Sequence, residues 1–202
     1  GARRTRNARL GLEKLRKSAD TVIVIPNDKL LQDDIMNLPL NLAFRHADEI
    51  LGNAIKCMTE ITSHGGLVNI DFADMRSIMD GGGVAMIGMG EGQGANRASD
   101  AVIAALTSPL LELDIGESKG ALVNVTGGDD MTLQEAHAVV KEVHSKINKD
   151  ARIIWGASVD STLEHQIRVM LVVTGVKSSQ ILGPPSGVDN EMQNRYGIEF
   201  VQ

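Results

Sequence analysis

The sequence predicts an α/β fold, because short apolar runs alternate with helical patterns along its second half. The strand candidates are four runs rich in Val and Ile, at 84–89, 121–126, 152–157 and 168–176. Helices are expected between the first three runs, at about 95–107 and 132–147, and Thr132 with Glu135 gives the second a capping-box start. We therefore expect a C-terminal α/β domain with a four-stranded sheet and two packed helices.

A long helix is predicted ahead of this domain. Apolar residues recur at helical spacing from 40 to about 63, and His64-Gly65-Gly66 ends the pattern. A helix of this length can form a rigid strut between two domains. It is preceded by a buried-type strand at 21–25, and by a basic segment that is predicted to form a surface helix and contains Arg3, Arg4, Arg6, Arg9, Lys14, Arg16 and Lys17.

Two glycine-rich stretches resemble phosphate loops only superficially. The run 81–83 leads into an apolar strand and has no Gly-Lys-Ser/Thr after it. The run 88–94 lacks the third glycine of a dinucleotide-binding loop, since Gln93 stands in its place. We expect this second run to be a mobile turn before a helix.

Composition favours a soluble cytoplasmic domain without a nucleic-acid surface. The 202 residues carry a formal net charge of -6, which disfavours binding to phosphate backbones. One cysteine, Cys57, allows no disulfide within the chain and is expected to be a small buried hydrophobe. No apolar run is long enough to span a bilayer, so direct membrane insertion is not expected.

One short segment combines an amide with two carboxylates. Asn69, Asp71 and Asp74 lie within six residues, directly after the long helix. They can converge where an extended loop turns into a helix, and such a cluster can polarise a water molecule or bind a cation. The spacing also allows a purely structural interpretation, in which Asp71 caps a helix at 72–79 and Asp74 lies in its first turn.

The segment Asn69-Ile70-Asp71-Phe72-Ala73-Asp74 resembles the synergy loop of FtsZ, the tubulin-like GTPase family of prokaryotic cell division. The stretches 20–31, 82–90 and 153–157 resemble other parts of the same family, and the resemblance covers roughly residues 1–180 in order. The Gly-Gly-Gly-Thr-Gly-Thr-Gly phosphate loop of the family has no match here. We therefore expect the C-terminal part of a longer protein, with archaeal relatives as the nearest comparison.

The resemblance implies a domain organisation for the chain. Its parts would be the remnant of a nucleotide-binding domain at 1–39, a central helix at 40–64, a C-terminal α/β domain at 65–182 and a flexible tail at 183–202.

The resemblance also implies the parts of a nucleotide site. Arg4 would contact phosphate, and Asn27, Phe44 and Asp48 would contact the guanine of GTP or GDP, which binds with Mg²⁺. An aspartate can accept two hydrogen bonds from guanine, which adenine cannot donate in that pattern. From the residues alone, Arg4 can equally be a solvated cation, Phe44 a core residue and Asp48 a partner of neighbouring charges.

In the family, subunits stack head to tail, so the synergy loop of one subunit reaches the GTP held by the next. Asp71 and Asp74 would then polarise the attacking water and Asn69 would hold the loop or the water. The terminal segment 197–201 resembles archaeal peptides that dock on the membrane anchor SepF, which implies action at the division site.

Two alternatives remain open. One is a non-catalytic binding or filament-capping module of the same fold. The other, a metal-dependent hydrolase using Asp71 and Asp74, has no His or Glu beside them at ligand spacing.

Overall fold

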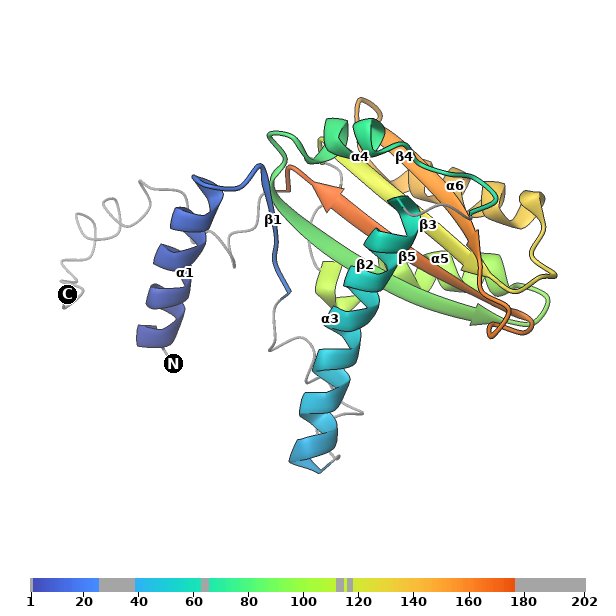
Figure 1. Cartoon of the computed structure of the whole chain (residues 1–202), viewed down its shortest axis with the longest axis horizontal. Coiled ribbons are helices and arrows are strands. Elements are labelled where there is room, and N and C mark those ends of the chain that lie inside the picture. The colour runs from blue at the N-terminus through green and yellow to red at the C-terminus, as the bar shows by residue number, and fades with distance from the viewer. Residues whose placement is uncertain (1, 26–38, 63–65, 112–114, 116–117, 177–202) are drawn as a thin grey trace, which may run out of the picture.

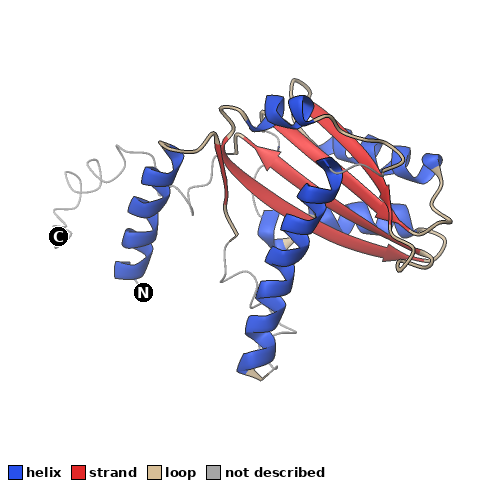
Figure 2. Cartoon of the chain, viewed as in Figure 1, coloured by secondary structure: helices blue, strands red, loops and turns tan. Residues whose placement is uncertain are grey.

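The computed structural model of the chain describes residues 2–25, 39–62, 66–111, 115 and 118–176. Its centre is a mixed five-stranded sheet with the strand order β1-β2-β5-β3-β4 (Figure 2). The strands are β1 (Thr21–Ile23), β2 (Gly83–Gln93), β3 (Gly120–Gly127), β4 (Arg152–Val159) and β5 (Gln166–Thr174). Strand β5 runs antiparallel to both β2 and β3, whereas β1 with β2 and β3 with β4 form parallel pairs.

Helices cover both faces of the sheet, as Figure 1 shows. The elements are α1 (Ala2–Arg16), α3 (Leu40–Thr62), α4 (Phe72–Met79), α5 (Arg97–Leu106), the short 3₁₀ turn η1 (Pro109–Leu111) and α6 (Leu133–Lys146). One apolar core lies between the sheet and the helix pair α5 and α6, and a second lies between the sheet and α3 with α4. Strand β3 is buried along its whole length because both cores pack against it.

The α/β class and the long helix are confirmed. Helix α3 spans Leu40–Thr62, and its second half packs on the sheet through Ala54 and Cys57, both 3 % exposed. Its first half extends past the sheet (Figure 1). No described helix is long and apolar enough to cross a membrane.

The sheet has one strand more than predicted. Segment 21–23 was assigned to the nucleotide-binding remnant, but it pairs in parallel with the start of β2 through Thr21–Gly83, Val22–Val84 and Ile23–Ala85. The Thr21 hydroxyl also donates to the carbonyl oxygen of Met79. A β-branched run beside an unpaired strand edge satisfies its backbone groups by joining that edge.

The glycine run 88–94 is a strand over most of its length, so the predicted mobile turn is wrong there. Gly88, Gly90 and Gly92 lie in β2 and face α5. A Cβ at Gly90 would overlap the backbone of Ala101 and Ala105. The glycines therefore allow the backbone of α5 to approach the strand closely.

Candidate functional site

The segment 66–74, here called the acidic loop, is attached to the edge of the sheet. The Val68 N–H donates to the Ala157 carbonyl oxygen at 3.1 Å, and the Ala157 N–H donates back to Val68 at 3.0 Å. A Cβ at Gly66 would lie 2.7 Å from the same Ala157 oxygen, so only glycine fits this approach. Ile70 is 5 % exposed and packs into the core beside α3. The acidic loop therefore has a fixed position on the outer strand.

The acidic loop presents its polar side chains to solvent. Asn69, Asp71 and Asp74 are all exposed. The Asn69 Oδ1 accepts a hydrogen bond from the Gly66 N–H at 3.0 Å, which closes the loop on itself. Both carboxylates lie at the start of α4, so the structure brings all three side chains into one loop-to-helix segment.

Asp71 and Asp74 each also have a structural partner. Asp71 is the N-cap of α4, and its Oδ1 accepts from the Ala73 N–H at 3.1 Å. Asp74 lies in the first turn, and its Oδ1 is 3.6 Å from Nη2 of Arg152, the first residue of β4. The capping interpretation of Asp71 is therefore confirmed. An exposed carboxylate keeps lone pairs for other partners, so capping does not exclude a chemical role.

The acidic loop also exposes two large apolar side chains to solvent. Leu67 is 64 % exposed and Phe72 is 62 % exposed. Large exposed apolar patches mark surfaces that contact another protein, and these two side chains lie on one short segment. The acidic loop therefore presents two carboxylates and two large apolar side chains to solvent on one short segment.

Three of the four predicted nucleotide-contact residues lie on the helices α1 and α3. Arg4 is an exposed residue of α1, and Asp48 is an exposed residue of α3. No hydrogen bond or ion pair joins these two side chains in the part of the chain that the structure describes. Phe44 belongs to α3, but its side chain is not among the described parts of the structure. Asn27 lies outside the described residues. The guanine and phosphate contacts thus stay predictions.

A buried charge cluster at the other end of the sheet was not predicted. Arg97 is 7 % exposed, and its guanidinium donates to Glu135 and Asp130 at 2.6 Å each. The Arg97 hydrogen bond holds the pKa of Glu135 at about 2, well below its usual value. The pKa of Asp130 is also lowered, by Arg97 first and by the His165 ring second. This cluster joins the start of α5 to the start of α6 and the β4–β5 turn, a structural role.

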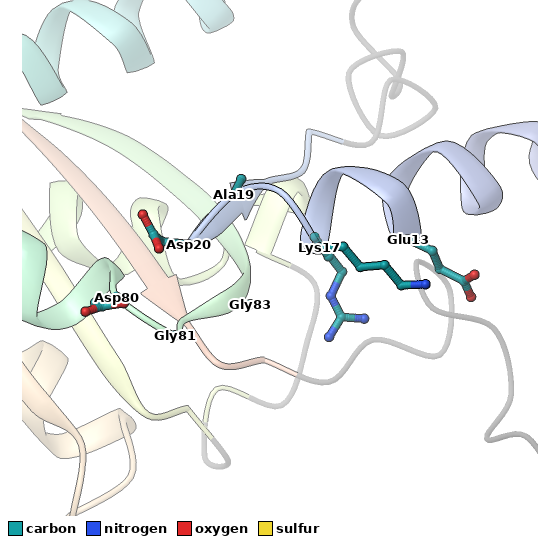
Figure 3. Close-up of a pocket in the computed structure, with 8 residues that line it drawn as sticks. Glu13, Lys17, Ala19, Asp20, Asp80, Gly81 and Gly83 are labelled. Carbon is teal, nitrogen blue, oxygen red and sulfur yellow. The ribbon is translucent and has the colours of Figure 1, made fainter.

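One hollow among the described residues is lined by none of the acidic-loop residues. It measures about 640 Å³ and is formed by the end of α1, the start of β1 and the turn from α4 to β2 (Figure 3). Charges of both signs line it, from Glu13, Arg16, Lys17, Asp20 and Asp80. None of the predicted site residues lines it, and its mixed charges favour no ligand class. Among the described residues, no three His, Cys, Asp or Glu side chains gather as a metal site would require.

Comparison with known proteins now adds to this geometry. Residues 83–177 match the model of the FtsZ family, C-terminal domain. Cell division protein FtsZ 1 of Archaeoglobus fulgidus is 54 % identical over 202 residues, which cover all of this chain and 54 % of the relative. The chain belongs to the FtsZ family. It spans about half the length of the FtsZ relatives that it matches.

Solved structures agree with the fold. The FtsZ dimer of M. jannaschii superposes with a TM-score of 0.82 and 50 % identity, over 87 % of this chain and 51 % of that one. CetZ2 from Haloferax volcanii, solved as a GTPγS-bound protofilament, superposes with a TM-score of 0.68 over 95 % of this chain and 58 % of that chain. At 16 % identity, the second likeness shows the tubulin-like fold alone.

Proposed function

We propose that the chain is the C-terminal part of an FtsZ-type GTPase of cell division, and that its acidic loop acts on GTP bound by the next subunit of a filament. The observation that carries the proposal is the fixed acidic loop, which exposes Asp71 and Asp74 on the same short segment as the apolar side chains of Leu67 and Phe72. A carboxylate pair on a surface suited to protein contact can serve a substrate that a neighbour holds.

The chemistry would be water activation for phosphoryl transfer. Asp74 and Asp71 orient and polarise the attacking water, and Asn69, bonded to Gly66, holds the loop that precedes them. The described residues offer no metal site of their own, so Mg²⁺ would enter with the nucleotide phosphates. Arg4, Asn27, Phe44 and Asp48 would belong to the nucleotide-bearing half of each subunit.

Head-to-tail stacking follows if one subunit supplies the acidic loop and the next subunit supplies the bound nucleotide. The surface that carries the acidic loop differs from the surface that carries the nucleotide, so the contact is heterologous and extends into an open filament. Hydrolysis is then coupled to assembly, because neither subunit holds a complete site. A membrane anchor of the SepF type would bind the tail at 197–201, which lies outside the described residues, and would place the cytoplasmic filament at the division site.

The test is a substitution in the full-length parent protein. Asp74→Ala should lower GTP hydrolysis by about 10²–10⁴-fold, because a positioned general base contributes that much. Nucleotide binding should stay nearly intact, since the carboxylate serves the neighbour, and filaments should persist longer. Turnover, nucleotide affinity and sedimentation would be measured together. Full hydrolysis by this variant would favour the alternative of a non-catalytic capping or binding module.

A further inference from the structure

The three polar side chains of the acidic loop differ in what holds them. The Asn69 oxygen and the Asp71 carboxylate accept from backbone N–H groups within three residues of themselves. Asp74 instead faces a side chain from a distant part of the sequence, since its Oδ1 lies 3.6 Å from Nη2 of Arg152. Of the three, Asp74 alone depends on a second element for its orientation.

We propose that Arg152 is a positioning residue that holds the Asp74 carboxylate in the orientation needed to activate water on the neighbouring subunit's GTP. The inference rests on the function proposed above. Arg152 touches neither water nor nucleotide in this role and acts through Asp74.

Both ends of the pair are anchored. Asp74 lies in the first turn of α4, whose start is fixed by the Asp71 cap. Arg152 opens β4, and its N–H donates to the Lys119 carbonyl oxygen at 3.2 Å, next to the pairing of Gly120 with Arg152. The distance between the two backbones is therefore set by the sheet and by α4. What stays free is the side-chain rotamer of Arg152 and of Asp74, and the ion pair restricts both.

Electrostatics give Arg152 a second effect on the same carboxylate. The acidic loop would bring two carboxylates toward a polyanionic nucleotide, and like charges repel. A guanidinium beside Asp74 offsets one of these negative charges while leaving the second carboxylate oxygen available to water. A neutral residue at 152 would lose both the restriction and the compensation, whereas a lysine would retain the charge without the planar donors.

The ion pair contributes little to folding. The side chains of Arg152 and Asp74 are 59 % and 52 % exposed, and ion pairs between exposed groups have small effects on stability. Loss of Arg152 should therefore leave the fold unchanged, which separates a positioning role from a structural one.

The experiment is a double-mutant cycle in the full-length parent, with GTP turnover measured at protein concentrations high enough to detect residual activity. Arg152→Gln should lower kcat about three- to tenfold, with the KM, the urea midpoint and nucleotide affinity unchanged. Arg152→Lys should recover most of the loss. In an Asp74→Ala background, Arg152→Gln should cause no further loss, because its target is gone. Lys149→Gln removes the same charge from an exposed site three residues away and should leave kcat at the parent value.

The outcomes separate the two claims. An unchanged kcat in Arg152→Gln, or an equal loss with and without Asp74, overturns the positioning role. If Asp74→Ala itself hydrolyses GTP normally, the proposed function fails and the inference fails with it. If Asp74→Ala is inactive and Arg152→Gln is normal, the inference alone fails.

Discussion

At the scale of single residues, Asp71 has two proposed tasks that substitutions can separate. Asparagine caps helices as well as aspartate does, so Asp71→Asn should keep the N-cap while losing the carboxylate charge. We expect GTP hydrolysis in the full-length parent to fall at least about 10²-fold, with stability lowered by less than about 1 kcal/mol. Asp71→Ala should cost about 1 kcal/mol more by losing the cap. Urea unfolding and GTP turnover measure the two effects, and normal turnover by Asp71→Asn would reduce Asp71 to a cap.

The buried Arg97 cluster predicts a defined pH dependence. Hydrogen bonds from Arg97 lower the pKa of Glu135 to about 2, so its contribution to stability is complete above its ordinary value of 4.5 and is lost as the pH falls toward 2. Glu135→Gln should cost about 2 kcal/mol at neutral pH and should flatten the stability profile between these two pH values. Urea unfolding monitored by the single tryptophan, Trp155, measures this. Glu142→Gln, a change at a half-buried position of the same helix outside the Arg97 cluster, should leave the profile unchanged. An unaltered slope in Glu135→Gln would contradict the prediction.

Residue roles were predictable where they depend on near neighbours. The capping box of Thr132 with Glu135 and the cap by Asp71 are confirmed, since each is set within a few residues of chain. The pairs Arg97–Asp130 and Arg152–Asp74 were not predicted. Their partners come from separate elements that only the folded sheet brings together, and no sequence spacing indicates them.

At the scale of elements, the glycines of β2 determine how α5 packs. We predict that Gly90→Ala lowers the free energy of unfolding by about 3 kcal/mol, because the new methyl group would overlap the backbone of Ala101 and Ala105, which cannot move aside. Gly52→Ala is the matched control. Nothing lies within 4 Å of its added methyl group, so alanine should stabilise α3 by up to about 1 kcal/mol. An unchanged free energy of unfolding for Gly90→Ala in urea would contradict this packing.

Most elements were predictable because their apolar periodicity is strong. The central helix, the four long strands and the helices α5 and α6 all form near their predicted positions. The exceptions have a physical cause. A strand rich in glycine looks like a turn in the sequence. Only the close approach of α5 explains why β2 continues to Gln93. The pairing of β1 with β2 was missed because sequence shows a strand but not its partner.

At the scale of the whole molecule, the chain contains the acidic loop and, on the separate helices α1 and α3, the exposed residues Arg4 and Asp48 that are proposed to contact a nucleotide. The family was predictable because several long motifs occur in order, and the match to FtsZ over residues 83–177 confirms it. The site was predictable only in part. Asn69, Asp71 and Asp74 lie on one segment. Of the residues expected to contact the nucleotide, Arg4 and Asp48 lie on separate helices, and Asn27 lies outside the described residues. The proposed site would be shared between subunits, so folding one chain would not complete it.

The most direct test of the shared site is therefore a mixing experiment with two inactive full-length variants. One carries Asp74→Ala in the acidic loop, and the other carries Asp48→Ala at the proposed nucleotide contact. In a random one-to-one filament, about a quarter of the interfaces pair an intact loop with an intact nucleotide site. We predict that GTP hydrolysis, nearly lost from each variant alone, rises in the mixture toward that fraction of the parent rate. Co-sedimentation of both variants without any recovered hydrolysis would contradict a site assembled from two subunits.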